Sequence, residues 1–367
     1  MSCDLLALAT KGVAGLQPYS GGKPIEELER ELGLDEIIKL ASNENPLGPS
    51  QKVLDIIAST KDLSRYPDGN GFSLKKALAE KHDVEPEKIT LGNGSNDVLE
   101  MVARAFVTTE HQVIYSQHSF AVYPIVTQAV GAEHVVVPAN DWGNDLPAML
   151  EAITDKTRLI FVANPNNPTG TWVNRSDLKN FLENVPEHVL VLLDEAYFEY
   201  AISEANYPDS SLWLDDFKNL IVTRTFSKAY GLAGLRIGYA LSHPDIANLL
   251  NRVRQPFNNN SLALVAAETA LQDTHYILHS VGVNHSGMKQ LTLAFDDMGL
   301  EFIPSKGNFI CVDFEQPADA IYDSLLKSGV IVRPVANYGM PNHLRVSVGL
   351  ESENKKFIDA LGKILAK

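Results

Sequence analysis

The chain has 367 residues, of which 31 are Lys or Arg and 46 are Asp or Glu, so its formal net charge at pH 7 is −15. With 45% hydrophobic residues it is too long and too apolar for a disordered tail, and it can form one large domain or two ordinary ones. The negative balance argues against a nucleic-acid binder, because neutralising phosphates requires clustered Lys and Arg.

Cysteine and histidine usage argues against disulfides and metal sites. The two cysteines, Cys3 and Cys311, cannot build a disulfide framework or a multi-thiolate site, and no histidine stands in a spacing typical of a metal ligand. The N-terminal residues lack the basic leader of a signal peptide, and the apolar run 188–193 is far too short to span a membrane. We therefore expect a cytoplasmic protein with neither a membrane nor a nucleic-acid partner.

Strand-like and helix-like segments alternate through the first two thirds of the chain. Short apolar or β-branched runs predict strands, and apolar residues recurring at helical spacing predict helices. The predicted strands are 89–91, 112–115, 159–162, 189–193 and 220–223, and the predicted helices between them are 98–105, 146–153 and 176–182. This alternation is typical of an α/β fold in which helices flank a mostly parallel sheet.

The pattern changes after about Pro256. Two long helical patterns, 262–271 and 285–298, precede predicted strands at 308–313, 330–333 and 344–348 and a closing helix at 353–365. We predict a large α/β domain at 45–260, a smaller α+β domain at 261–367, and an N-terminal arm, 1–44, that packs on the smaller domain.

The most informative residues follow two of the predicted strands. Lys228 lies shortly after the strand at 220–223, among small and hydroxyl side chains that leave a lysine poorly solvated. Asp194 ends the strand at 189–193. Alone, the lysine is a typical surface residue and the aspartate a typical turn or cap residue. Ligands bind at the carboxyl ends of parallel strands, so we expect an acid and an amine at one functional edge.

Two turns and an arginine complete the pattern. Asn and Pro fix a rigid turn at 164–170, and the glycine-rich turn 92–97 leads into a helix whose N-terminus suits a phosphate. Arg236 follows eight residues after Lys228. These groups are the parts needed to hold pyridoxal 5′-phosphate as a Schiff base, with the carboxylate keeping the pyridine nitrogen protonated.

The motifs Asn-Asn-Pro-Thr-Gly at 166–170, Asp-Glu-Ala-Tyr at 194–197 and Ser-Lys-Ala-Tyr-Gly-Leu-Ala-Gly-Leu-Arg at 227–236 are similar to those of a known family. The chain resembles the class I/II aminotransferases of fold type I, and within them the histidinol-phosphate aminotransferase branch. The resemblance covers nearly the whole chain, including the segments 16–19, 40–48, 65–68, 333–334 and 344–349.

The resemblance implies a role for each cofactor residue. Lys228 would carry the cofactor as a Schiff base and move the proton between the substrate Cα and C4′. Asp194 would pair with the pyridinium nitrogen, and Asn167 and Tyr197 would bond the phenolic oxygen. The groups expected around the phosphate are Gly94, Ser95, Asn96, Thr225, Ser227 and Arg236. Phe120, or alternatively Tyr123, would stack on the ring, and Tyr66 would reach the phosphate of the neighbouring subunit of a homodimer.

The resemblance also implies the reaction. Arg333 and Arg345 would meet the anionic end of the substrate, with Tyr19, Asn45 and Asn308 as further contacts by position. The expected reaction exchanges an amino group between histidinol phosphate and 2-oxoglutarate, giving imidazole acetol phosphate and glutamate. An aromatic amino acid aminotransferase is the alternative, because an arginine accepts a phosphate or a carboxylate. A decarboxylase of the same fold and a non-catalytic regulatory module are further alternatives.

Overall fold

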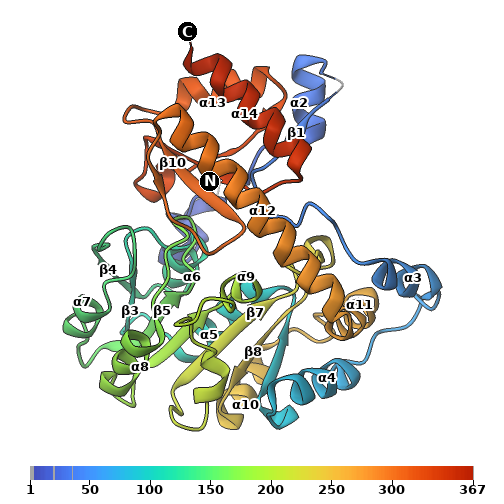
Figure 1. Ribbon diagram of the computed structural model, residues 1–367. Helices are drawn as coiled ribbons and strands as arrows, with labels where there is room; N and C mark the ends of the chain where they lie inside the picture. The colour runs from blue at the N-terminus through green and yellow to red at the C-terminus, as the bar shows by residue number, and fades with distance from the viewer. Residues whose placement is uncertain (1–3, 20, 35, 367) are drawn as a thin grey trace.

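The computed structural model describes residues 4–19, 21–34 and 36–366. Figure 1 shows a large sheet flanked by helices in the lower part of the molecule and a smaller unit, which carries the C-terminus, above it. The long helix α12 (Thr274–Met298) runs from the smaller unit down to the larger one.

A seven-stranded sheet forms the centre of the larger unit, in the order β2-β8-β7-β6-β5-β3-β4. Its strands are β2 (Ile89–Gly92), β3 (Gln112–Ser116), β4 (Glu133–Val137), β5 (Thr157–Ala163), β6 (Leu190–Asp194), β7 (Leu220–Thr225) and β8 (Gly238–Ser242). Neighbouring strands from β4 to β7 are parallel, whereas β8 is antiparallel to both β7 and β2. The predicted α/β fold with a mostly parallel sheet is confirmed, and the antiparallel β8 is an addition that the sequence pattern did not indicate.

Both faces of the central strands are buried, which explains why β5 and β6 are mostly apolar. On one face the strands pack against α5 (Ser95–Phe106), α6 (Val122–Ala129) and α10 (Pro244–Val253). On the other face they pack against α4 (Phe72–His82), α7 (Leu146–Glu151), α8 (Arg175–Asn184) and α11 (Ser261–Gln272). Successive residues alternate between the faces, as Leu192 and Leu193 of β6 do.

The smaller unit contains a four-stranded antiparallel sheet in the order β12-β13-β10-β9. Its strands are β9 (Phe302–Ile303), β10 (Phe309–Asp313), β12 (Arg333–Pro334) and β13 (His343–Ser347), and α12, α13 (Asp319–Lys327) and α14 (Glu351–Leu365) pack beside it. The predicted single strand at 330–333 is wrong. Residues Val330–Ile331 form β11 and pair with β1 (Ile38–Lys39), whereas β12 turns away to pair with β13.

The remaining helices are short. They are α1 (Lys11–Ala14), α2 (Ile25–Leu32), α3 (Gln51–Ser59) and α9 (Phe198–Ala201), with 3-10 turns at Leu6–Leu8, Pro86–Lys88, Ser210–Trp213, Ala233–Leu235 and Ala336–Tyr338. Helix α11, which follows the predicted domain boundary at residue 260, packs against α3 and α4, and its alanines belong to the same hydrophobic core as the seven-stranded sheet. The change to small-domain packing falls along α12.

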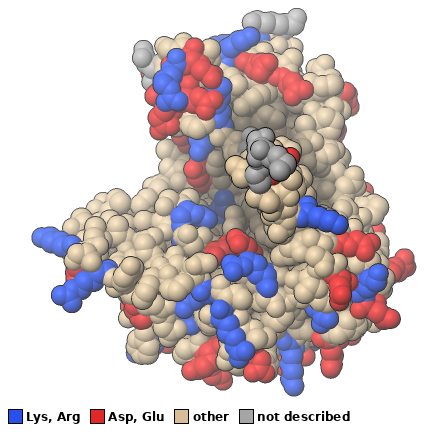
Figure 2. All heavy atoms as spheres, turned by 180° about the vertical axis from the view of Figure 1, so that it is seen from behind, with Lys and Arg blue, Asp and Glu red and all other residues tan. Residues whose placement is uncertain are grey.

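The surface carries charges of both signs. Figure 2 shows acidic and basic side chains interspersed over one face of the molecule. Among the residues that the structure describes, no helix is both long enough and apolar enough to cross a membrane.

Candidate active site

A cavity of about 140 Å³ lies at the carboxyl ends of β5, β6 and β7. Apart from Ala163, Pro165 and Ala196, every residue that lines it was named from the sequence. The other lining residues are Ser95, Asn96, Phe120, Tyr123, Asn167, Asp194, Tyr197, Thr225, Ser227, Lys228 and Arg236. Strand ends separated by 30 residues or more of sequence therefore converge on one small space.

Lys228 contributes a poorly solvated amine to this cavity. Its Nζ donates a hydrogen bond to the carbonyl of Ser42 at 3.2 Å and lies 5.7 Å from the centre of the Tyr197 ring. Burial, followed by the nearby positive charge of Arg345, lowers the lysine pKa to about 8. A larger share of the amine is then neutral, and the neutral form is the nucleophile and the base.

Asp194 is a buried carboxylate held from two sides. The Tyr123 hydroxyl donates to Oδ2 at 2.9 Å, and the Thr223 hydroxyl donates to Oδ1 at 3.3 Å. Burial raises the pKa of Asp194, and these hydrogen bonds oppose that effect because they favour the ionised form. The Tyr123 ring stacks on Phe161, with centroids 4.5 Å apart and planes 1° from parallel, whereas Phe120 meets Tyr123 edge-on. Sequence reasoning did not identify the bond between Tyr123 and Asp194.

Donors for an anion gather at the other end of the cavity. Helix α5 begins at Ser95, just after Gly94, whose φ of +83° suits glycine. A side chain at position 94 would collide with the Arg236 guanidinium, so glycine lets the arginine lie against the backbone. Arg236 donates to the Ser227 hydroxyl at 3.2 Å, and the Thr225 hydroxyl accepts from the Ser227 backbone N–H at 3.1 Å. Helix N-termini and guanidinium groups both bind phosphates well.

The small domain contributes contacts beside this cavity. Arg345 on β13 donates to the Asn167 side-chain oxygen and, at 2.8 Å, to the Ala41 carbonyl. Asn43 donates to the Tyr197 hydroxyl at 2.9 Å, and its own N–H donates to the Ser347 hydroxyl at 2.8 Å. Asn43 was not predicted as a site residue, although it lies two residues before Asn45 in the segment 40–48.

The remaining predicted residues do not line the cavity around Lys228. Tyr19 and Arg333 line a different cavity of about 570 Å³, where the guanidinium lies 5.8 Å from the tyrosine ring. Asn45 donates to the Ala229 carbonyl and the Ser280 hydroxyl, both at 2.9 Å. Asn308 donates to the Asn43 carbonyl at 3.0 Å. Tyr66 is 82% exposed and stacks on Phe257 at 4.6 Å.

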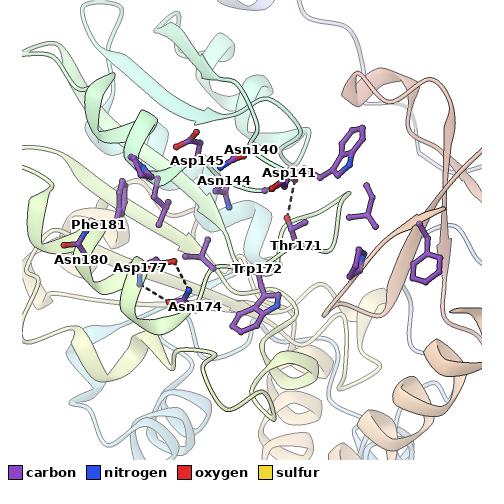
Figure 3. A pocket seen from close by; sticks show the side chains of 18 of the residues that line it. Asn140, Asp141, Asn144, Asp145, Thr171, Trp172, Asn174, Asp177, Asn180 and Phe181 are labelled. Atoms are coloured by element: carbon purple, nitrogen blue, oxygen red, sulfur yellow. Dashed lines mark hydrogen bonds between the residues drawn. The ribbon is translucent and has the colours of Figure 1, made fainter. Parts of the chain in front are cut away.

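A larger cavity, of about 1040 Å³, lies between the loop before α7, helix α8 and strand β9 (Figure 3). Trp142, Trp172, Asp141, Asp145 and Asp177 are among its lining residues, and none of the predicted site residues is. No lysine lines it, so it lacks the amine that the smaller cavity provides. Within residues 4–19, 21–34 and 36–366, no group of three or more His, Cys, Asp and Glu side chains is placed to hold a metal ion.

The fold and the lysine cavity are those of an aminotransferase. The chain belongs to the family described as aminotransferase class I and II, whose model matches residues 35–361. It is 60% identical over 370 residues to histidinol-phosphate aminotransferase 2 of Pseudomonas fluorescens, with 100% of both chains covered. It is 59% identical over 366 residues to histidinol-phosphate aminotransferase 2 of Pseudomonas aeruginosa, with 99% of each chain covered.

Solved structures agree with this assignment. The crystal structure of histidinol-phosphate aminotransferase from Sinorhizobium meliloti in complex with pyridoxal-5′-phosphate has a TM-score of 0.90 at 32% identity, covering 98% of each chain. L-threonine-O-3-phosphate decarboxylase from Porphyromonas gingivalis has a TM-score of 0.80 at 23% identity, covering 90% of this chain and 100% of that one. The second similarity concerns the fold alone.

Proposed function

We propose that this protein is a pyridoxal-phosphate-dependent transaminase that exchanges an amino group between L-histidinol phosphate and 2-oxoglutarate, giving imidazole acetol phosphate and L-glutamate. One observation carries the proposal: Lys228 and Asp194 line the same cavity as the anion-binding groups at the start of α5 and Arg236. The full-length similarity to histidinol-phosphate aminotransferases supports the choice of substrate. We place the reaction in the cytoplasm, because the two cysteines of the chain cannot build a disulfide framework.

The donor set fits the cofactor. Gly94 leaves room for the Arg236 guanidinium beside the first turn of α5, and hydroxyls of Thr225 and Ser227 lie beside it, as a phosphate requires. Asp194 provides a buried carboxylate for a ring nitrogen, and Asn167 and Tyr197 can bond a phenolic oxygen. Phe120 is the aromatic side chain that we assign to the ring face, because the hydroxyl of Tyr123 is engaged by Asp194.

Pyridoxal phosphate, when bound, supplies an electron sink for the carbanion that forms when the substrate Cα loses a proton. The Nζ of Lys228 is the base for that step. Its lowered pKa of about 8 lets it accept the proton and then release it. The hydroxyls of Tyr123 and Thr223 favour the ionised form of Asp194, and that carboxylate would pair with the protonated ring nitrogen of the cofactor. The same residues serve both halves of a ping-pong exchange.

The arginines of the small domain select the substrate. Arg345 lies against Asn167 at the cavity, and we assign it to the anionic group nearest the reacting carbon. Arg333 lies in the adjacent strand, paired in register with Arg345, and we assign it with Arg345 to the anionic end of the substrate, with Tyr19 beside it. Asn45 and Asn308 act on substrate binding indirectly. Their hydrogen bonds to the carbonyls of Ala229 and Asn43 hold the loop 43–45 in place.

We propose further that the enzyme works as a homodimer in which Tyr66 completes the partner's site. Leu63, Tyr66 and Phe72 are exposed apolar side chains in one short segment, with Phe257 stacked on Tyr66. A complementation assay tests this arrangement. Heterodimers of a Lys228→Ala subunit and a Tyr66→Ala subunit contain one intact site only when Tyr66 acts across the interface, so they should regain activity that each homodimer lacks. Inactive heterodimers would show that Tyr66 serves its own subunit.

The reaction itself is tested by the absorption spectrum of the cofactor-loaded protein without any keto acid. Histidinol phosphate should convert the bound cofactor to its amino form at a much lower concentration than phenylalanine does. Lys228→Ala should abolish turnover. Conversion by phenylalanine alone would instead identify an aromatic aminotransferase, release of carbon dioxide a decarboxylase, and a colourless protein that ignores added cofactor would contradict the whole assignment.

A further inference from the structure

A second cluster of charges lies directly behind the cavity. Arg224 and Glu195 are 1% and 0% exposed, and the arginine Nε and Nη2 donate to Glu195 Oε2 at 2.9 and 2.7 Å. Nη2 also donates to Asp209 Oδ1 at 2.7 Å, and the guanidinium carbon lies 3.3 Å from the centre of the Phe198 ring. One buried cation thus holds two carboxylates and an aromatic face.

The place of this cluster in the sheet relates it to the cavity. Glu195 follows Asp194 at the end of β6, and Arg224 lies between Thr223 and Thr225 on β7. Neighbouring residues of a strand point to opposite faces. Thr223 bonds Asp194 on the cavity side, so Arg224 points away from the cavity and bonds Glu195 behind it.

The cluster therefore ties together the two strand ends that carry the cavity residues. The Glu195 N–H donates to the Thr223 carbonyl at 2.9 Å, which continues the ladder between the strands. Asp209 in turn fixes the turn at Ser210–Trp213 by accepting from the Ser211 N–H at 3.2 Å. Sliding one strand against the other would break the paired hydrogen bonds of the guanidinium.

Burying charged groups costs free energy, so stability of the fold alone does not explain this cluster. Burial raises the pKa of Glu195, and the charge of Arg224, followed by a hydrogen bond from Ser210, opposes that effect. Well-packed apolar side chains commonly stabilise a fold as well as a buried ion pair does. What the planar guanidinium adds is a fixed direction and spacing for each hydrogen bond.

We propose that Arg224, with Glu195 and Asp209, is a positioning residue of the active site, which sets the spacing between Asp194 and the segment Thr225–Lys228. It touches neither substrate nor cofactor and acts through those residues. The inference rests on the proposed transaminase function, and its test keeps the two separable.

The test compares three variants of the full-length protein with the wild type. The double variant Arg224→Met/Glu195→Leu removes both buried charges and keeps much of the volume. Arg224→Lys keeps the charge and loses the paired geometry. Phe181→Leu, in the core of the same domain on α8, is the matched control for general loosening.

Three measurements are made on each variant: the thermal midpoint of the cofactor-free protein, the dissociation constant for pyridoxal phosphate, and kcat with KM for histidinol phosphate. A fourth, the pH midpoint for chemical modification of Lys228 in the cofactor-free protein, needs no catalysis. Each is compared with the wild-type value.

Both Arg224 variants should bind the cofactor and turn over at least about tenfold less well, the size of effect that a small misplacement of reacting groups produces. Their KM should stay within about threefold, because the substrate arginines lie in the other domain, and the Lys228 midpoint should move. Phe181→Leu should lower only the thermal midpoint.

Cofactor affinity, kcat and the Lys228 midpoint all unchanged in Arg224→Lys would overturn the proposal, as would the same result in a folded double variant. If the double variant does not fold, Arg224→Lys decides alone. A wild-type protein that binds pyridoxal phosphate but leaves histidinol phosphate unchanged would refute the proposed function, whereas the comparison of cofactor affinities would still test the positioning role.

Discussion

Replacing Tyr123 by Phe removes one hydroxyl and leaves the ring stacked on Phe161. The hydroxyl donates at 2.9 Å to Asp194, and both side chains are buried. A hydrogen bond to a charged group contributes about 1.5–3 kcal/mol. Because it favours the ionised carboxylate, its loss should weaken the hold of Asp194 on a protonated ring nitrogen. Converted to rate, this predicts a fall in kcat/KM of roughly 10- to 150-fold.

The assay is kcat/KM for histidinol phosphate across a range of pH, with the dissociation constant for pyridoxal phosphate measured in parallel. The acid side of the profile should move to higher pH in the Tyr123→Phe variant, because the carboxylate now accepts a proton more readily. Tyr115→Phe is the matched control: its hydroxyl bonds His134 at 2.6 Å, away from the cavity. Equal activity and equal pH profiles in the wild type and Tyr123→Phe would refute the reasoning.

Three further predictions concern the cavity and its border. Gly94→Ala should weaken pyridoxal phosphate binding roughly tenfold, because forcing a side chain into this backbone conformation costs about 1–3 kcal/mol. Gly234→Ala is the control: there is open space around position 234, so the dissociation constant should not change. The rate at which the cofactor-free protein takes up pyridoxal phosphate should rise with pH through about 8, since Lys228 attacks as the neutral amine; a midpoint near 10.5 would contradict its lowered pKa. Arg345→Lys should raise KM for glutamate at least about tenfold in steady-state assays, because lysine cannot form the paired bonds of a guanidinium; an unchanged KM would remove Arg345 from substrate binding.

Local sequence patterns predicted the parts of the fold that depend on local chemistry. Runs such as 159–162 and 189–193 are apolar because both faces of the sheet are covered, and they correspond to β5 and β6. Strand β8 was missed because Gly238–Ser242 continues the lysine motif, and periodicity carries no information on strand direction. The break between β11 and β12 was missed for a related reason: one apolar run supplies strands to two different sheets.

The candidate site divides in the same way. Asp194 and Lys228 could be predicted because each follows a strand, and parallel strands end at one edge. The supporting contacts could not be predicted, because their partners are distant in the chain: Tyr123 and Asp194 are 71 residues apart, and Asn43 and Tyr197 are 154 apart. No local pattern specifies such a pairing, which depends on how whole elements pack.

The residues around the cavity belong to separately packed cores. Lys228 and Asp194 are carried by strand ends of the seven-stranded sheet, whereas Arg345 is carried by β13, whose Leu344 and Val346 pack with α14. Substitutions that repack one core leave the other core's contacts in place, since distant sites act almost independently. The two cores meet, however, at Arg345, whose guanidinium donates to Asn167 and whose charge lowers the pKa of Lys228, so a shift of β13 would change substrate binding and lysine reactivity together.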